Sequence, residues 1–383
     1  MALPKKLDLM PKKKILIVGP AYPLRGGLAT YNERLCRAFI EQGHDCEILS
    51  FSLQYPSLLF PGKTQFSSDP KPNDIRIYSE INSINPLNWI GVGKKFARKK
   101  YDLVIFRYWM SFMAPSFGTI ARLLQKSGAR VIAITDNIVP HEKRFFDSAF
   151  TDYFLHSCHG FLSMSKEVQA QAQALQPNKK VAYVAHPMYD MFGSAQTKKD
   201  AKEQLGLNPN YNYLLFFGFI RKYKGLNLLL DSFAKVDREK YKVKLIIAGE
   251  FYEPSEPYLA QINELGLADD VVLKTDFIPN NEVAAYFSAS DMVVQTYISA
   301  TQSGVTQIAY FYDKPMLVTD VGGLSELVPA GKVGYVCQQD SVEIAGAIEN
   351  FYQAQKYDAF SAGVAEEKQK FTWEFLSEQL LEV

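Results

Sequence analysis

The sequence predicts an α/β protein made of two doubly wound domains, and three observations lead to this fold class. Short apolar runs alternate with helical stretches from residue 14 to residue 135, a polar stretch follows at 194–200, and the alternation restarts at 213–217. The chain has 383 residues, of which 47% are hydrophobic, and this is enough apolar material for two cores. We expect domains at 1–190 and 191–364, followed by a C-terminal segment at 365–383.

The first half begins with a strand, a glycine-containing loop, a helix and a second strand. KILIVG at 14–19 is a short apolar run that ends at glycine, residues 31–42 have helical spacing, and GHDCEILSF at 43–51 reads as the second strand. Further strands are expected at 103–106 and 131–135, with helical stretches between them. This order is typical of a parallel sheet that helices cover on both faces.

The second half repeats the same architecture. Strands are expected at 213–217, 244–248, 271–273, 292–294 and 316–318, and residues 365–383 have the spacing of an amphipathic helix. Doubly wound domains bind ligands at the carboxyl ends of their strands. We therefore expect the ligand in a cleft between the two domains.

Composition excludes several classes of protein. Lys and Arg total 42 against 41 Asp and Glu, so no global field would hold nucleic acid. The four cysteines form no Cys-x-x-Cys pair and the first residues lack a secretory apolar core, which favours a cytoplasmic protein. The uncharged stretch 292–312 is crowded with hydroxyl and amide side chains, so it does not predict a membrane span.

A cationic loop follows the strand at 213–217. Gly218 ends this strand, and Arg221 and Lys224 follow before a helical run. Planar guanidinium and compact ammonium groups beside helix N–H groups would neutralise a diphosphate. The alternative is a solvated basic loop with no ligand.

A polar run between two apolar strands is the second candidate site. Ser303 is a plausible N-cap, so free backbone N–H groups would open a helix that carries Gln307 in its first turn. A core helix with Ser and Thr caps is the alternative. The candidate ligand-binding residues of this run are Ser299, Thr301, Gln302, Ser303, Gly304 and Gln307.

Gly26 and Gly27 follow the first strand and precede a helix, where two glycines would let the backbone approach a ligand closely. A turn that serves only to reverse the chain is equally compatible with them. The loop lacks Gly-x-Gly-x-x-Gly, which disfavours a nicotinamide-dependent dehydrogenase.

Six segments carry a resemblance to a known family. In chain order they are HPMYDMFG, FGFIRKYKGLNLLLDSF, LIIAGEF, FIPNNEVAAYFSASDMVVQTY, DKPMLVTDVGGLSELV and FTWEFLSEQLLEV. Together they resemble the retaining nucleotide-sugar glycosyltransferases of family four (glycosyl transferases group 1) over nearly the whole chain. The resemblance implies the GT-B fold of two Rossmann-like domains, with the acceptor in the first, the donor in the second, and the helix 365–383 packing back on the first.

The resemblance also implies roles for particular residues. Arg221 and Lys224 would hold the diphosphate of a UDP- or GDP-linked donor, although the family's arginine normally stands where this chain has Phe219. Gly26 and Gly27 would approach the phosphate or the transferred sugar. The nucleobase would lie between Phe277 and Ile278, with Glu250 near the same pocket.

Two departures from the family concern the donor sugar and the acceptor. Ser299 and Gln307 occupy the places of a pair of glutamates, which we interpret as a variant donor site where Thr301, Gln302, Ser303 or the backbone recognises the sugar. Asp136 stands where the family often has histidine. His141 and Glu142 follow in the same loop, so either could approach the acceptor, and a loop-fixing hydrogen bond is the alternative for His141.

The expected reaction is transfer of a sugar to a hydroxyl acceptor with retention of configuration, without a metal or a cofactor other than the donor substrate. Lys94, Lys95, Arg98, Lys99 and Lys100 form a basic cluster near Trp89, which could touch the inner face of a membrane and suit a lipid-linked glycan acceptor in cell-surface polysaccharide assembly. A solvated helix face is the alternative. Rival functions are a non-catalytic sugar-nucleotide-binding protein and a two-domain ligand-binding protein.

Overall fold

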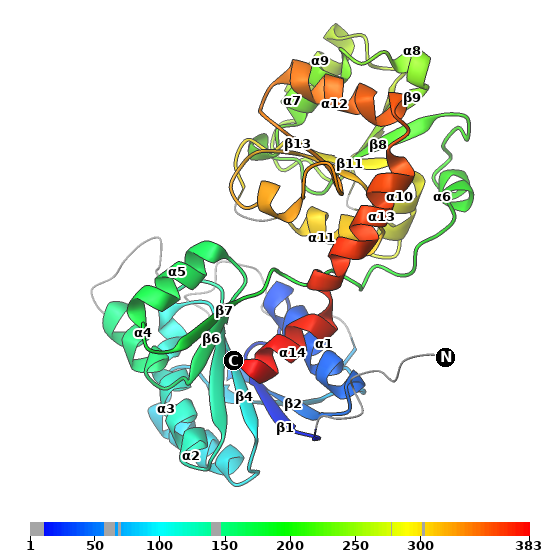
Figure 1. Ribbon diagram of the computed structural model, residues 1–383. Helices are drawn as coiled ribbons and strands as arrows, with labels where there is room; N and C mark the ends of the chain where they lie inside the picture. Colours follow the sequence, from blue (N-terminus) through cyan, green and yellow to red (C-terminus); the bar gives the residue numbers. More distant parts are fainter. Residues whose placement is uncertain (1–10, 57–65, 68–69, 139–146, 277, 301–302) are drawn as a thin grey trace, which may run out of the picture. The chain divides into compact units, whose positions relative to one another are not determined.

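The computed structural model describes residues 11–383 except 57–65, 68–69, 139–146, 277 and 301–302. It divides into two compact units. Unit 1 comprises residues up to His186 together with Trp373–Val383, and unit 2 comprises Pro187–Thr372. Each unit is a parallel sheet with helices on its faces, as predicted (Figure 1).

In unit 1 the described residues form a seven-stranded sheet in the order β3-β2-β1-β4-β5-β6-β7. All neighbouring strands run parallel, and β1 pairs with both β2 and β4. The strands are β1 (Lys14–Val18), β2 (Asp45–Leu53), β3 (Arg76–Asn82), β4 (Leu103–Tyr108), β5 (Arg130–Thr135), β6 (Gly160–Ser163) and β7 (Lys180–Tyr183). The helices are α1 (Gly27–Glu41), α2 (Pro86–Ala97), α3 (Ala114–Gln125), α4 (Asp147–Leu155), α5 (Lys166–Leu175) and α14 (Trp373–Glu382).

Alternate residues of the central strands of unit 1 face two different cores. On β1, Leu16 and Val18 pack in one core with α2, α3 and α4, whereas Ile15 and Ile17 pack in the other with α1 and α14. Side chains alternate between the two faces of a sheet, so an unbroken apolar run requires cover on both. This is why the short apolar runs of the sequence predicted a doubly wound sheet.

The C-terminal segment is divided between the two units. Residues 365–383 are predicted as one helix, but α13 (Tyr357–Glu367) ends early, a 3₁₀ turn covers Lys368–Phe371, and α14 then begins at Trp373. Thr372 between them has extended backbone angles, which interrupt the helical hydrogen bonds. α14 packs on α1, where the Trp373 and Tyr31 rings lie 4.8 Å apart (Figure 1).

Unit 2 has a six-stranded sheet in the described residues, in the order β10-β9-β8-β11-β12-β13. Its core lies between β8, β9, α7 and α12. The strands are β8 (Asn212–Phe217), β9 (Val243–Ala248), β10 (Val271–Lys274), β11 (Met292–Gln295), β12 (Met316–Thr319) and β13 (Gly334–Cys337). The helices besides α13 are α6 (Lys198–Gln204), α7 (Leu226–Phe233), α8 (Arg238–Tyr241), α9 (Glu256–Glu264), α10 (Val283–Ala289), α11 (Gly304–Phe311) and α12 (Ser341–Gln353).

Candidate functional site

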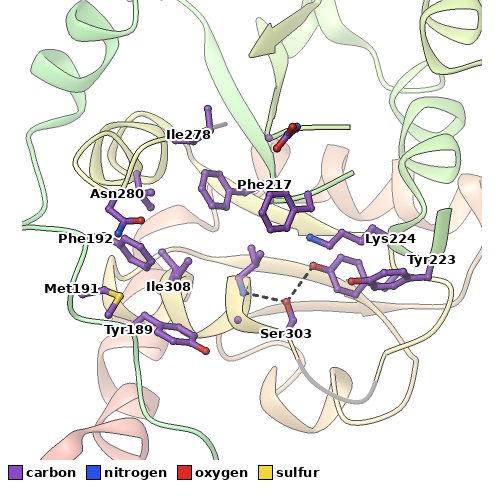
Figure 2. Close-up of a pocket in the computed structure, with 18 residues that line it drawn as sticks. Tyr189, Met191, Phe192, Phe217, Tyr223, Lys224, Ile278, Asn280, Ser303 and Ile308 are labelled. Carbon is purple, nitrogen blue, oxygen red and sulfur yellow. Dashed lines mark hydrogen bonds between the residues drawn. The ribbon is translucent and has the colours of Figure 1, made fainter. Parts of the chain in front are cut away.

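Unit 2 contains a pocket of about 390 Å³ at the carboxyl end of its sheet (Figure 2). Its walls are built by residues that follow β8, β9, β10 and β11, by the first turn of α11, and by the segment before α6. The lining residues are Tyr189, Met191, Phe192, Phe217, Gly218, Phe219, Tyr223, Lys224, Gly249, Glu250, Ile278, Asn280, Val283, Tyr297, Ser303, Gly304, Val305 and Ile308. A ligand-sized hollow at this end of a parallel sheet is where doubly wound domains bind their ligands.

Two glycines shape the loop between β8 and α7. Gly218 has a φ of +93°, and a Cβ there would lie 2.9 Å from the Lys224 Nζ. Gly225 has a φ of +67°, and a Cβ there would lie 1.9 Å from the Thr296 carbonyl oxygen. Left-handed backbone and close packing both require glycine at these positions. They let the chain turn sharply enough to place Lys224 in the pocket wall.

Lys224 is a buried cation without a counter-ion. Its side chain comes from a single 3₁₀ turn, Lys222–Lys224, and the residue is 8% exposed. Among the described residues, no carboxylate or carbonyl bonds its ammonium, which lies over the Tyr297 ring. Burial, with a smaller contribution from Arg221, lowers the pKa of Lys224 to about 8. Figure 2 shows this ammonium turned toward the middle of the pocket, where it would attract an anion.

The N-terminus of α11 faces the same pocket. Ser303 is its N-cap, as predicted, and its Oγ accepts a hydrogen bond of 3.2 Å from the Val305 N–H. The Ser303 hydroxyl in turn donates to the Gln295 Oε1 at 2.7 Å. The first N–H groups of a helix carry partial positive charge. This helix end and Lys224 therefore favour a negatively charged ligand in one small space.

Part of the polar run fits the alternative of a capped core helix. Thr306 is buried, and its hydroxyl donates to the Gln295 Oε1 at 3.1 Å. Gln307 is 2% exposed, and neither its Oε1 nor its Nε2 has a hydrogen-bond partner in the described structure. Gln307 and the exposed Ser299 are not among the pocket-lining residues. Their roles in donor binding stay predictions.

The structure brings several of the predicted residues together. Arg221 lies elsewhere: it is exposed, is not in the pocket lining, and sits over the Tyr252 ring with its Cζ 4.9 Å from the ring centre. The predicted residues that line the pocket are Gly218, Lys224, Glu250, Ile278, Ser303 and Gly304. Outside the described residues lie His141, Phe277, Thr301 and Gln302.

Three of the predicted residues that the structure describes belong to unit 1. Gly26 is the N-cap of α1 with a φ of +111°, Gly27 is the first residue of α1, and a Cβ at either would meet nothing within 4 Å. Asp136 follows β5, and its two carboxylate oxygens accept bonds of 2.7 Å from Nε and Nη2 of Arg107. Burial raises the pKa of Asp136, and the charge of Arg107 opposes this. Bidentate pairing fixes this carboxylate in one orientation.

An apolar wall of the pocket was not predicted from the sequence. Tyr189, Met191 and Phe192 come from HPMYDMFG, which the resemblance marks only as an interdomain segment. Figure 2 shows them at the opposite side of the view from Lys224 and Tyr223. The signal that could have revealed them is the clustering of three large apolar side chains in a connecting segment, where polar residues are the norm.

Within the described part of the chain, no group of three or more His, Cys, Asp or Glu side chains is placed to hold a metal ion. Independence from a metal stays a prediction of the resemblance.

Comparison with known proteins finds similarity to glycosyltransferases. Residues 211–354 match the family Glycosyl transferases group 1. An uncharacterized glycosyltransferase of Methanocaldococcus jannaschii is 20% identical over 97% of both chains. A D-inositol 3-phosphate glycosyltransferase of Pseudarthrobacter chlorophenolicus is 30% identical, but the match covers only 40% of this chain and 37% of that protein.

Solved structures agree on the fold. The HepE protein of Anabaena, in complex with UDP, has a TM-score of 0.65 and 17% identity, covering 96% of this chain and 98% of that one. Sucrose-phosphate synthase of Thermosynechococcus elongatus has a TM-score of 0.63 and 16% identity, covering 97% and 98%. The predicted fold class is confirmed, as is the resemblance in its coarser form. The chain is a GT-B glycosyltransferase, and its residues 211–354 form a glycosyl transferases group 1 domain.

Proposed function

We propose that the protein transfers a hexose from a nucleoside-diphosphate sugar to a hydroxyl acceptor. The observation that carries this proposal is the ammonium of Lys224, which is buried in the unit 2 pocket without an anion from the protein. Burying an uncompensated charge is costly unless a ligand neutralises it. A diphosphate held between Lys224 and the N-terminus of α11 would do so. HepE, which shares the fold, was solved with UDP, and this supports a nucleoside diphosphate as the ligand.

In the proposed reaction the bond between the anomeric carbon and the diphosphate oxygen breaks, and a bond to the acceptor oxygen forms. Negative charge then develops on the leaving diphosphate, where Lys224 and the helix N–H groups stabilise it. The resemblance to retaining enzymes favours attack on the face that the leaving group vacates. The acceptor proton passes to an oxygen of the leaving diphosphate, so no protein nucleophile is required.

The ends of the pocket suit different parts of the donor. Met191, Phe192 and Ile308 form an apolar end, which suits a planar nucleobase. Ile278, one of the two residues predicted to flank the base, also lines the pocket. We therefore place the base toward this end and the sugar toward Lys224 and Tyr223.

We further propose that unit 1 contacts an anionic membrane through α2, which would bring a lipid-linked acceptor to the enzyme. Leu87, Ile84 and Ile90 are 80%, 52% and 40% exposed at the start of this helix. Two of the cations that follow are paired, Lys95 with Glu80 and Lys99 with Glu47. The other cations of the basic cluster have no acidic partner among the described residues; they are Lys94, Arg98 and Lys100. Exposed apolar side chains beside unpaired cations are typical of membrane-surface helices.

Two further observations bear on location. No helix in the described part of the chain has the length and apolar composition needed to cross a bilayer. All four cysteines are buried free thiols, which supports a reducing compartment and hence our proposal of a cytoplasmic protein.

A donor panel tests the proposed function. The protein is incubated with UDP-, GDP- and ADP-linked hexoses, and release of nucleoside diphosphate and thermal stabilisation are both measured. We expect one base to stabilise the protein selectively and its sugar derivative to be consumed. Stabilisation without any release would favour the non-catalytic alternative, and the absence of both would contradict the proposed function.

A further inference from the structure

An exposed pair of aromatic rings stands at the mouth of the unit 2 pocket. Phe219 and Tyr252 are 40% and 48% exposed, and their rings are stacked with centres 4.2 Å apart at an angle of 28°. The guanidinium of Arg221 lies over the Tyr252 ring at 4.9 Å. We call Phe219, Tyr252 and Arg221 the aromatic shelf. Two exposed aromatic rings stacked beside a pocket form a contiguous apolar surface, which is typical of binding sites.

The shelf is held rigidly by backbone hydrogen bonds beyond the strand ends. Ile220 N–H donates to the Glu250 carbonyl at 2.8 Å, and Tyr252 N–H donates to the Ile220 carbonyl at 3.0 Å. These bonds continue the pairing of β8 with β9 past its last residues. The two loops therefore present their rings in a fixed arrangement before any ligand arrives, which reduces the entropy lost on binding.

The shelf connects the pocket with the surface outside it. Phe219 lines the pocket directly after Gly218, whereas Tyr252 is not among the lining residues. A ligand that touches both rings must therefore project out of the pocket. In the proposed reaction the donor occupies the pocket, and the acceptor is the partner that arrives from outside to meet the sugar near Lys224.

The surroundings of the shelf match a sugar ring better than a nucleobase. A pyranose has one face of C–H groups, which pack on aromatic rings, and a rim of hydroxyls, which need polar partners. Arg221 stands over Tyr252, Glu250 lines the pocket beside Phe219, and Glu253 accepts a hydrogen bond from the Lys222 N–H at 2.8 Å. The apolar end with Met191 and Phe192 offers a base a less charged place.

We propose that the aromatic shelf binds a pyranose ring of the acceptor, so that Phe219 and Tyr252 determine which acceptors are used. This inference rests on the proposed function for the direction of transfer, but not for the binding of the ring itself. The acceptor is thus a glycan or glycolipid with at least one pyranose, rather than a free lipid alcohol or a small inorganic acceptor.

Saturation-transfer NMR on the full chain tests the shelf directly. The probes are methyl α-D-glucopyranoside, methyl α-D-galactopyranoside and methyl α-D-mannopyranoside, each with and without UDP and GDP. The variants are Phe219→Leu, which keeps an apolar side chain, and Tyr252→Ala. Tyr153→Ala on α4 is the matched control. Tyr153 is 39% exposed, and the guanidinium of Arg122 lies over its ring, as that of Arg221 does over Tyr252.

We expect at least one glycoside to receive saturation at its ring protons, and its dissociation constant to rise about five- to tenfold in each shelf variant. Tyr153→Ala should bind the glycoside as the unchanged protein does. Thermal stabilisation by UDP or GDP should be equal in the unchanged protein, Tyr252→Ala and Tyr153→Ala, because neither tyrosine lines the pocket.

Three results would overturn the inference. They are no saturation transfer to any glycoside, glycoside binding that the shelf variants leave unchanged, or a loss of nucleotide binding in Tyr252→Ala equal to its loss of glycoside binding. The last result would mean that the shelf rings bind the donor nucleotide and not the acceptor. Failure of the proposed function is distinguishable, since it would abolish nucleotide stabilisation in the unchanged protein while leaving the glycoside measurement readable.

Discussion

The ammonium of Lys224 lies 5.7 Å from the centre of the Tyr297 ring. Unit 2 contains a second buried lysine for comparison: Lys314 is 6% exposed, and burial lowers its pKa to about 8 as well. Its ammonium donates to the Ser290 carbonyl at 3.0 Å and to the Tyr357 hydroxyl at 3.3 Å. Lys314 is therefore satisfied by the fold, whereas Lys224 keeps its hydrogen-bonding capacity for a ligand.

We predict opposite effects on stability when these two lysines are replaced. Lys224→Met should stabilise the ligand-free protein at about pH 7, by on the order of 1 kcal/mol or more, because it removes a buried charge with no partner. Lys314→Met should destabilise it by a similar amount, because it leaves buried acceptors unpaired. Urea unfolding measures both. Turnover should fall by orders of magnitude only in Lys224→Met, and full activity there would contradict the proposed mechanism.

Nucleotide affinity should depend on pH through Lys224. Its pKa in the free protein is lowered to about 8, so the ammonium is charged below that pH and neutral above it. A diphosphate binds the charged form, and the dissociation constant of the nucleotide should therefore rise as pH increases through about 8, by up to tenfold per pH unit. Calorimetry in buffers of different ionisation enthalpy should also detect proton uptake on binding above this pH. In Lys224→Met both effects should vanish, and a constant affinity in the unchanged protein would exclude this role of Lys224.

Gly218 and Gly331 provide a matched test of how the cationic loop is shaped. Both have positive φ, +93° and +76°, but a Cβ at Gly331 would meet nothing within 4 Å, whereas one at Gly218 would meet the Lys224 Nζ. Replacement by alanine should cost each about 1 kcal/mol of stability from backbone strain. Only Gly218→Ala should also weaken thermal stabilisation by nucleotide, because it displaces the ammonium. Equal nucleotide binding in the two variants would refute this coupling.

The Arg107–Asp136 pair should behave as a coupled buried ion pair. Arg107 is 3% exposed, and its guanidinium carbon lies 3.9 Å from the centre of the Tyr31 ring. Asp136→Leu should destabilise unit 1 by roughly 3–5 kcal/mol, since it leaves the guanidinium unpaired, and the double variant with Arg107→Met should recover much of the loss. Denaturant unfolding of the full chain gives the free energy of unfolding for the unchanged protein, the two single variants and the double variant. Additive losses in the double variant would show that the two side chains stabilise the fold independently.

Binding to vesicles tests the membrane surface of α2. The protein should co-sediment with vesicles that contain phosphatidylglycerol and much less with pure phosphatidylcholine, and added salt should weaken the binding. Leu87→Glu should reduce it strongly, because it places a negative charge among the exposed apolar residues. Val342→Glu is the control, because Val342 is also highly exposed, at 66%, but lies on α12 of unit 2. Binding that ignores lipid charge, or an equal loss in both variants, would count against the proposed surface.

Local pattern predicted most of the secondary structure. The strands at the centre of both sheets were recognisable because β-branched and aromatic residues form short runs bounded by glycine, as at 14–19 and 213–217. The helical spacing starts at 31, whereas α1 begins at Gly27, because its N-cap Gly26 gives no side-chain signal. The break at Thr372 was missed for a similar reason: no Pro or Gly marks it.

The candidate site was predicted unevenly. The motifs and the resemblance together predict Gly218, Lys224, Glu250, Ile278, Ser303 and Gly304 as site residues, and these do line one pocket. They gave no indication that Arg221 would lie on Tyr252, or that Gln307 would be buried away from the pocket lining. Sequence spacing fixes which element a side chain belongs to, but its direction depends on the loop geometry and on the rings packed around it.

The sequence by itself determined the two parallel α/β units and the strand-to-helix loop that holds Lys224, because apolar periodicity and glycine spacing are local properties of the chain. Only the tertiary structure decided that this ammonium would be buried without a counter-ion, and that Phe219 and Tyr252 would stack at the pocket mouth. The first feature arises where the segments after β8 and β11 meet, and the second where those after β8 and β9 meet. Residues far apart in the chain come together there only after the sheet has formed.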